Sequence, residues 1–492
     1  MAEIAPKKRG NGITPASVFD WWNVFLGAAE IAWTREAGRE AISAAGLRRT
    51  KALIEFAGSH SPFYRDKWRG IALDHCDLKQ LPIVTKPELM SRCDDWITDR
   101  SIRREDVERF VRDRTHIGEP LAGKYLVWKS SGSSGEPAVF LQDRTALAVY
   151  DALLAVQLRS VEVASHYAWG LLTQGGRAAL VVATGDHFAS IASWQRVCRG
   201  TPWPNARAFS VADPLPALVA QLNAFEPAFL ASYPTTLVML AGERRAGRLK
   251  IAPSCLWSGG EYLSQAAHAA IERAFDTVLV NDYGASECLS IAHSCPHRTL
   301  HVNADWLVLE PVDRNYEPTP PGKPSHTVLL TNLANRIQPI IRYDLGDSVT
   351  LQTTPCACGS NLPAIRAEGR RDDVLCLCAE DGSAVRLSPL ALTTIVEEVT
   401  GSHRFQVVQT APDGIDVRLG VSEPRTRTAE WHATQEALAA FLAQQSLSNV
   451  RLKLAAQPPE PDPRSGKLRE VLAYPNALVR APNEGRRPVQ GS

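Results

Sequence analysis

The sequence lacks long hydrophobic segments. None of its apolar runs approaches the roughly 20 residues that a membrane-spanning helix needs. The basic side chains of residues 1–12, MAEIAPKKRGNG, are not followed by an apolar stretch of the signal-peptide type. Both absences favour a cytoplasmic protein with no membrane partner.

Strong charge of either sign is also lacking, since the formal net charge is +1. This balance argues against a nucleic-acid partner and against binding to an anionic membrane. Ten cysteines in a chain without a secretory signal indicate reduced thiols rather than a disulfide framework.

What is present is typical of a folded globular protein, with 45% hydrophobic and 22% charged residues. Between Lys129 and Leu330, helical patterns such as residues 145–161 alternate with short apolar runs at residues 178–184, 228–233 and 277–283. Short apolar runs separated by helices indicate strands buried on both faces of a largely parallel sheet. The predicted fold class is α/β, with mixed, mostly parallel sheets.

The pattern changes near Gly369. Two strand-like runs, residues 405–410 and 415–421, precede a helical pattern at residues 428–445, which indicates a small, separate α+β domain. Both ends of the chain are polar and contain Gly and Pro, so we expect them to be disordered. The predicted boundaries are residues 1–12 and 480–492 for the disordered ends, 13–369 for a large domain and 370–479 for a small one.

A helical start is predicted for the large domain. Phe19, Trp22, Phe25 and Leu26 recur at helical spacing. We interpret the adjacent pair Trp21 and Trp22 as an anchor that docks this helix, rather than as a ligand cage, because aromatic rings bring a large area to bury.

Residues 129–137, KSSGSSGEP, have the composition of a flexible linker, but strand-like runs lie on both sides at residues 125–128 and 138–141. A Gly-rich turn between strands offers N–H groups and hydroxyls to an anion. It is not a Walker loop, because no Gly-Lys-Ser/Thr sequence ends it. A phosphate-binding loop and a plain β-hairpin turn both fit this segment taken alone.

Further motifs accompany this loop in a fixed order, and together they resemble the phenylacetate–CoA ligase family of the adenylate-forming superfamily. The resemblance spans about residues 50 to 475. It is carried by residues 61–65 (SPFYR), 81–86 (LPIVTK), the Ser/Gly loop, 259–261 (GGE), 283–287 (YGASE), 342–347 (RYDLGD), 369–375 (GRRDDVL) and 464–467 (RSGK).

The resemblance implies a nucleotide site. Asn281 and Tyr283 would hold adenine, beside Gly284 and Ser286, with Gly260 and Glu261 lining the same pocket. Asp347 would bind the ribose hydroxyls, Arg370 would contact ribose or phosphate, and Glu287 would coordinate Mg²⁺, an ion that prefers oxygen ligands. The loop that would close over the ATP phosphates consists of Ser130, Ser131, Gly132, Ser133, Ser134 and Gly135.

The implied reaction is ATP-dependent activation of a carboxylic acid, aryl or arylacetic by analogy, to acyl-AMP, followed by thioester formation with CoA. Asp372 would be the hinge of the small domain. Lys467 would be the adenylation lysine, against the alternative of a solvated surface lysine. A homodimer is also expected. Two alternatives remain: transfer to an amine or a carrier-protein thiol, and a non-catalytic nucleotide-binding homologue.

Glu136 departs from the family pattern, which has lysine there. An acid beside a triphosphate would repel it. Either Glu136 points to solvent, with Lys129 or another cation compensating, or ATP use is weakened or lost. We favour the first interpretation because the other nucleotide motifs are present.

A second cluster is rich in metal-binding side chains. By resemblance, Cys295, His301, Cys356 and Cys358 would form a structural zinc site, an ordinary closed ligand set; His297 and Cys288 are spare candidates. The alternative is buried free thiols and surface histidines. Cys376 and Cys378 share one strand face and are predicted to lie in the core.

The residues of the acyl pocket are the hardest part of the site to identify from the sequence. His187 and Phe188 follow a predicted strand, and Tyr233 and Pro234 follow another. By resemblance these segments would lie near the substrate carboxylate, although a lone histidine is often a structural residue.

Overall fold

The computed structural model describes the chain in twelve stretches. They are residues 20–73, 76–130, 138–158, 161–200, 205–261, 263, 265–367, 375–387, 389–400, 405–421, 423–460 and 470–472. Several predicted site residues therefore lie outside the described residues. They are Ser131, Gly132, Ser133, Ser134, Gly135, Glu136, Arg370, Asp372 and Lys467.

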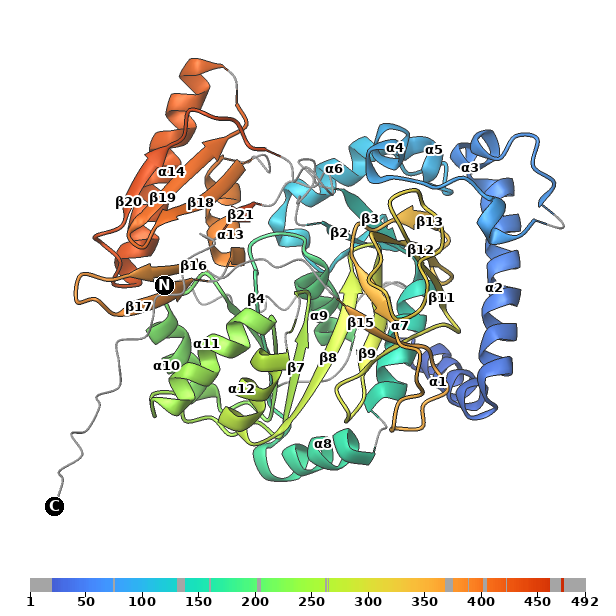
Figure 1. Cartoon of the computed structure of the whole chain (residues 1–492), viewed down its shortest axis with the longest axis horizontal. Helices are drawn as coiled ribbons and strands as arrows, with labels where there is room; N and C mark the ends of the chain where they lie inside the picture. Colours follow the sequence, from blue (N-terminus) through green and yellow to red (C-terminus); the bar gives the residue numbers. More distant parts are fainter. Residues whose placement is uncertain are drawn as a thin grey trace.

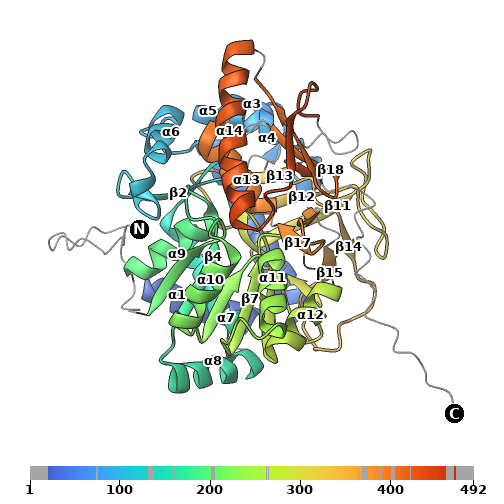
Figure 2. The ribbon, with the colours of Figure 1, turned by 90° about the vertical axis from the view of Figure 1, so that its left-hand side faces the viewer.

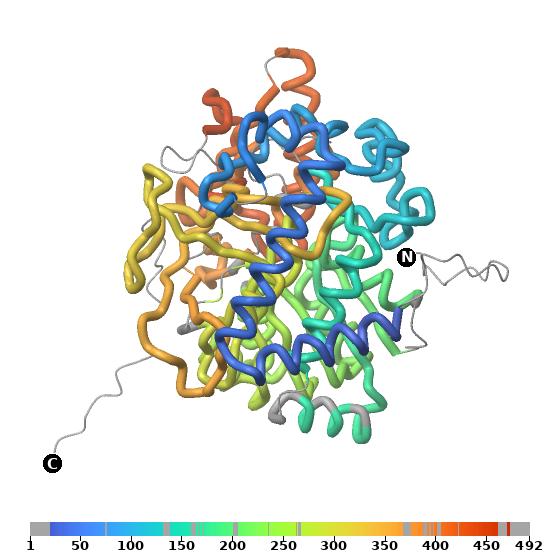
Figure 3. The backbone as a smooth tube through the Cα atoms, turned by 90° about the vertical axis from the view of Figure 1, so that its right-hand side faces the viewer, coloured from blue at the N-terminus to red at the C-terminus, as the bar shows by residue number. Residues whose placement is uncertain are grey.

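The N-terminal part is helical, as predicted. Two long helices, α1 and α2, lie at an angle to each other at the front of Figure 3, in blue. The elements are α1 (Trp21–Glu36), α2 (Arg39–His60), α3 (Pro62–Lys67), η2 (Leu78–Gln80), α4 (Lys86–Ser91), α5 (Cys93–Trp96), α6 (Arg104–Arg112) and η3 (Arg114–His116). Helix α1 buries Val24, Ala28 and Ile31, and α2 turns back along the core from Gly38.

The anchor prediction for the tryptophan pair was wrong. Trp21 and Trp22 are 60% and 68% exposed. The reason is that α1 docks through the face of Val24, Ala28 and Ile31, and small and branched side chains there bring it close to α7 (Arg144–Leu158). Both indoles lie in the first turn of α1 and stay largely exposed.

A mixed sheet forms the centre of the molecule (Figures 1 and 2). Among the described residues its order is β14-β15-β10-β9-β8-β7-β6-β4-β5. The parallel half comprises β4 (Ala178–Val182), β5 (Ala206–Ser210), β6 (Phe229–Ser232), β7 (Cys255–Gly259) and β8 (Val278–Ala285). The antiparallel half adds β9 (Cys288–Ser294), β10 (Leu300–Val302), β14 (Val349–Leu351) and β15 (Ala364–Ala367).

The helices that cover this sheet alternate with its strands, as in other α/β proteins. They are α7 (Arg144–Leu158), α8 (Val161–Gln174), α9 (Ala189–Gly200), α10 (Leu215–Phe225), α11 (Pro234–Arg245) and α12 (Gln265–Phe275). Strand β4 is buried along its whole length, which explains its unbroken run of apolar residues.

Two smaller sheets flank the central one. The first consists of β1 (Pro120–Leu121), β2 (Tyr125–Lys129) and β3 (Val139–Gln142). The second consists of β11 (Leu307–Val312), β12 (Thr327–Asn332) and β13 (Ile340–Asp344). Strands β2 and β3 are antiparallel, so the Ser/Gly segment joins two strands of a hairpin.

The C-terminal part has a hydrophobic core of its own and an α+β composition, as predicted (Figure 1). Its elements are β16 (Leu375–Cys378), β17 (Ala384–Leu387), α13 (Pro389–Thr400), β18 (Phe405–Ala411), β19 (Gly414–Leu419), α14 (Pro424–Gln444), β20 (Arg451–Leu454) and β21 (Val471–Leu472). The core prediction for Cys376 and Cys378 was wrong, because Leu375 and Leu377 occupy the buried face of β16 at 0% exposure.

No described helix has both the length and the hydropathy that a membrane crossing requires. The fold is thus the predicted α/β architecture, with a large mixed sheet and a smaller α+β part.

Candidate active site and metal centre

Several motif residues in the described stretches lie close together at one edge of the central sheet. Parallel strands end at the same edge, which is where ligands bind in open α/β sheets. Tyr233 follows β6, and Gly260 follows β7. A Cβ on Gly260, whose φ is +83°, would lie 3.1 Å from the Tyr233 ring, so only glycine fits comfortably. Glu261 is the next residue and is half-buried.

Tyr283 and Asp347 come together as the resemblance implies. The Tyr283 hydroxyl donates a hydrogen bond to Asp347 Oδ2 at 2.9 Å. Gly284 lies in β8 where this strand approaches β9. Only glycine fits there, because a Cβ would lie 2.0 Å from the Leu289 carbonyl oxygen. The Ser286 carbonyl accepts a hydrogen bond from Trp128 at 2.8 Å, which ties this turn to β2.

Two buried polar atoms on this face have no hydrogen-bond partner among the described residues. They are Asn281 Oδ1 and Ser258 Oγ, and the two residues are paired across β7 and β8. Buried polar atoms normally have partners. An acceptor at Asn281 therefore fits a ligand that brings a donor, such as the amino group of adenine.

Glu287 is held in place by Tyr343. The Tyr343 hydroxyl donates to Glu287 Oε1 at 2.8 Å, and the carboxyl group is buried. The neighbouring residue Arg342 has a φ of +49°. Its guanidinium donates a hydrogen bond to the Leu81 carbonyl at 2.6 Å. A carboxylate held in this way could bind a hard cation such as Mg²⁺.

The base of the Ser/Gly segment is closed by Ser130. Its N–H donates to the Ala138 carbonyl at 2.9 Å, and its hydroxyl accepts from Lys86 Nζ at 3.2 Å. Lys129 forms an ion pair with Asp186 instead. Among the described residues, Lys86 thus brings a cation to Ser130. It belongs to the motif of residues 81–86, and no role was predicted for it.

The candidate acyl-pocket residues lie nearby and are all buried. His187 is fully buried, and its Nε2 lies 3.0 Å from the Asp113 carbonyl. Burial lowers its pKa. These contacts fit the structural alternative for His187 better than a substrate-facing role. Phe188 and Tyr233 are 8% and 9% exposed, and Pro234 begins α11.

The four proposed metal ligands form a compact group. The ligand atoms of Cys295, His301, Cys356 and Cys358 all lie within 4.8 Å of one another. Cys295 Sγ is 3.6 Å from Cys356 Sγ, and Cys358 Sγ is 3.2 Å from His301 Nε2. Residues separated by about 60 positions in the sequence meet here because β10 pairs with β9 and β15. The grouping of these four side chains is the one that the family resemblance implied.

The surroundings of this group suit a metal. His301 Nδ1 lies 3.3 Å from the Leu362 carbonyl, which leaves Nε2 for coordination. The Ser360 N–H donates to Cys358 Sγ at 3.4 Å. Neither spare candidate joins the group: His297 is exposed, and Cys288 lies in the core of the large part.

The C-terminal part approaches this edge of the sheet. Glu398 of α13 lies 3.9 Å from Arg114, and its carboxylate lies over Gly185, where an added Cβ would be only 2.2 Å away. The loop that carries Asp186 and His187 is thereby covered by α13.

We expect Asp282 to make stability pH-dependent. Burial raises its pKa to about 7, and its Oδ1 has no described hydrogen-bond partner. The unfolded chain loses this proton near pH 4, so the free energy of unfolding should fall between pH 4 and 7, by up to about 4 kcal/mol. Asp282→Asn should flatten this fall in urea unfolding across that range.

The control is Asp381→Asn, because hydrogen bonds to Ser383 lower the pKa of this exposed carboxyl. That variant should keep the wild-type fall. An Asp282→Asn protein with an unaltered pH profile would contradict the assignment.

Comparisons with known proteins agree with this architecture. No family model matches the sequence, and no curated protein sequence matches it either. A crystal structure of 2-hydroxyisobutyryl-CoA ligase, in complex with 2-HIB-AMP and CoA in the thioesterification state, gives a TM-score of 0.52 at 21% identity, over 88% of this chain and 89% of that one. A structure of the same ligase in an open conformation gives 0.49 at 20% identity, over 92% and 91%. The chain has the fold of this CoA ligase.

Proposed function

We propose that this chain is an adenylate-forming acid–thiol ligase. A carboxylate oxygen of the substrate would attack the α-phosphorus of ATP, forming acyl-AMP as the bond to pyrophosphate breaks. The CoA thiol would then attack the acyl carbon, lose its proton and displace AMP. The contact that supports this most is the Tyr283–Asp347 hydrogen bond, because it joins the proposed adenine-binding and ribose-binding residues. The side-chain oxygen of Asn281, which has no described partner, lies two residues before Tyr283.

The other nucleotide contacts follow from their places around that pair. Gly260 and Glu261 would line the adenine pocket, and Ser130 with residues 131–135 would bind the phosphates. Arg370 would contact ribose or phosphate. Glu287 would hold Mg²⁺, which when bound supplies positive charge to the phosphates.

Lys86 is the residue that we propose compensates the negative charge of Glu136. Its ammonium lies at the first serine of the loop, and so places a cation where the loop residues begin. We propose that it replaces part of the charge of the customary lysine, so that ATP use is retained.

The acyl acceptor and the acid substrate are proposed by analogy. We propose CoA as the acceptor, and an aryl or arylacetic acid as the substrate, by analogy with phenylacetate–CoA ligases. Residues 13–369 would form the adenylating domain and residues 370–479 a lid that turns at Asp372. A cytoplasmic location and a homodimer also remain predictions.

The test is pyrophosphate release across a panel of aryl, arylacetic, 2-hydroxy and medium-chain acids, with and without CoA. The ligase should release pyrophosphate with at least one acid class and form AMP continuously only with CoA. Turnover with an amine or a carrier protein but not CoA would favour the first alternative. ATP binding without pyrophosphate release from any acid would favour a non-catalytic homologue.

We further propose that the Cys₃His group holds one structural zinc ion. Purified protein should contain about one zinc per chain, because three thiolates and one imidazole form a closed tetrahedral set. Cys356→Ser should reduce zinc content severalfold and lower the midpoint of thermal unfolding by roughly several degrees, since metal binding energy contributes to folding.

The matched control is Cys76→Ser, which makes the same chemical change at a cysteine outside the group. It should leave both quantities near their wild-type values. Metal-free protein of unchanged stability would rule out a structural zinc site.

A further inference from the structure

Helix α1 has a second apolar face, and this face is exposed. Trp22, Phe25, Leu26 and Trp33 are 68%, 65%, 46% and 76% exposed, and Ala29 among them is exposed as well. Since each residue of a helix turns by about 100°, these five positions form one stripe along α1, apart from the positions that the helix buries. The helix lies at the front of Figure 3. We call this surface the aromatic stripe.

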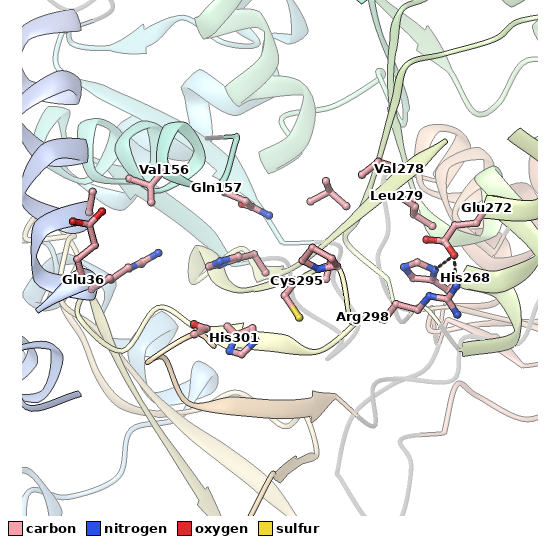
Figure 4. Close-up of a pocket in the computed structure, with 17 residues that line it drawn as sticks. Glu36, Val156, Gln157, His268, Glu272, Val278, Leu279, Cys295, Arg298 and His301 are labelled. Carbon is pink, nitrogen blue, oxygen red and sulfur yellow. Dashed lines mark hydrogen bonds and ion pairs between the residues drawn. The ribbon is translucent and has the colours of Figure 1, made fainter. Parts of the chain in front are cut away.

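The inner side of α1 is already occupied by the rest of the chain. Val24, Ala28 and Ile31 are buried. Arg35 pairs with Asp305 at 2.9 Å, and near it α1 and α7 wall a cavity of about 440 Å³ (Figure 4). The described chain therefore packs against the inner side, and the aromatic stripe is left to solvent.

The exposed rings have the chemistry of a protein–protein contact. The Trp22 and Phe25 rings are stacked, with 6.3 Å between their centroids and 25° between their planes, so they already hold each other in place. Tryptophan is enriched among the residues that dominate interface energies. Contiguous exposed apolar surface marks interaction sites. The aromatic stripe is therefore suited to bind a partner with an apolar face.

The spacing of the stripe matches a second copy of itself. Trp22, Leu26, Ala29 and Trp33 follow one another at intervals of 4, 3 and 4 residues, which is the spacing of a two-helix seam. This series is the same in both directions. In an antiparallel pair, Trp22 would therefore lie opposite the partner's Trp33. Leu26 would lie opposite the partner's Ala29, and a large side chain facing a small one lets two helices pack closely.

The area of the stripe fits a weak dimer. Three rings that are each about two-thirds exposed offer roughly 400 Å² per copy, since one aromatic side chain can bury roughly 150–250 Å². Leu26, Ala29 and the margins of the stripe would bring the total for two copies towards the low end of the range of about 1,200–2,000 Å² for specific complexes. An interface of this size suits a reversible dimer of micromolar affinity.

The charges beside the stripe do not suit a membrane surface. Residues 21–36 contain Glu30, Glu36 and a single basic residue, Arg35, which is already ion-paired. Arg49 of α2 pairs with Glu30 at 2.6 Å. A helix that lies on an anionic membrane is rich in Lys and Arg along its polar face. The balanced charges of α1 favour a protein partner instead.

We propose that the aromatic stripe is the surface through which two copies of this chain form an antiparallel, twofold-symmetric dimer. Each copy would use the same residues, as in other isologous interfaces. The homodimer predicted above had no surface assigned to it, and this inference supplies one. It holds whether or not the chain is a ligase.

The test is sedimentation velocity of the full-length protein. Between about 1 and 200 µM, it should pass reversibly from monomer to dimer, with a dissociation constant in the micromolar range. Leu26→Glu and Trp33→Glu should each raise that constant at least about tenfold, because they place a charge in an apolar seam. The midpoint of thermal unfolding should stay near the wild-type value, because both positions are exposed.

The matched control is Trp169→Glu, at a tryptophan of α8 that is 65% exposed. It should leave the dissociation constant unchanged, since it makes the same chemical change outside the aromatic stripe.

A mixture of two variants tests the antiparallel arrangement. Leu26→Glu and Ala29→Lys each disfavour their own dimer, but in a mixed dimer the new carboxylate would lie opposite the new ammonium. Mixing them should recover at least about tenfold in affinity over either variant alone. Mixing Leu26→Glu with Ala29→Glu should give no recovery, because both new charges are negative.

A monomer at every concentration would overturn the proposal, including one whose stripe is covered by residues 1–19. A dimer that neither Leu26→Glu nor Trp33→Glu weakens would also overturn it, as would a dimer that Trp169→Glu weakens equally. Opposite-charge mixtures without recovery would rule out the antiparallel arrangement. A monomer that binds phosphatidylserine vesicles through Trp33 would contradict the proposal and assign the stripe to a membrane.

Discussion

Lys467→Ala is expected to slow acyl-AMP formation by roughly 10²-fold or more, the usual scale for the loss of one electrostatic stabiliser. Lysine carries a compact charge on a flexible stem, which suits contact with both the substrate carboxylate and the α-phosphate. The measurement is single-turnover formation of acyl-AMP from acid and ATP. The position of Lys467 in residues 464–467, at the end of the predicted lid, motivates this expectation.

The same variant should behave differently in the second half-reaction. Supplied with preformed acyl-AMP, it should transfer the acyl group to CoA at a near-normal rate, because lid rotation would move Lys467 away from the site. Lys453→Ala, in β20 of the same part, is the control and should affect neither step. Equal loss in both half-reactions, or none in either, would remove Lys467 from the mechanism.

Glu287→Gln is expected to lower the adenylation rate by at least about 10²-fold and to raise the Mg²⁺ concentration required for activity. The amide is similar in shape but lacks the charge that a hard cation needs. Its fold should persist, because Tyr343 can still donate to the amide oxygen. Adenylation rates at a series of Mg²⁺ concentrations provide the measurement.

Tyr343→Phe separates positioning from ligation. It removes the hydroxyl that donates to Glu287 Oε1 at 2.8 Å but keeps the carboxylate. We expect a Mg²⁺ requirement raised by roughly 10-fold, the scale of a lost outer partner, with activity recovered at saturating Mg²⁺. If Glu287→Gln leaves the rate and the Mg²⁺ requirement unchanged, the carboxylate is not a metal ligand.

Much of the architecture could be predicted because it depends on local patterns. The buried strand β4 has an unbroken apolar run, and the Ser/Gly segment is flanked by strand-like residues. The grouping of Cys295, His301, Cys356 and Cys358 was also predicted, because the family resemblance implied it. These features could be predicted because they depend on the types of residue present and on their order.

The errors arose where the outcome depends on packing between distant segments. Trp21 and Trp22 have the area to anchor a helix, but both lie in its first turn and stay largely exposed, while α1 packs through Val24, Ala28 and Ile31. Period 2 placed Cys376 and Cys378 on one face correctly, but it could not say which face of β16 is buried.

The roles of two site residues were missed for a similar reason. Lys86 of α4 reaches Ser130 after β2, and Tyr343 of β13 reaches Glu287 in the turn between β8 and β9, because tertiary packing brings these elements together. Their positions inside recognised motifs were the only signal in the sequence. Side-chain partners across 44 and 56 positions follow from tertiary structure rather than from local order.

The most direct test of the central claim is the fate of a carboxylate oxygen. The substrate is an acid that the protein accepts, labelled with ¹⁸O at both carboxylate oxygens. Complete turnover with ATP and CoA should give AMP that carries one ¹⁸O per molecule, because the attacking oxygen stays on the α-phosphorus when the thiol displaces AMP. Mass spectrometry of the products reads this out. Unlabelled AMP, or ADP with the label in orthophosphate, would contradict an acyl-AMP intermediate.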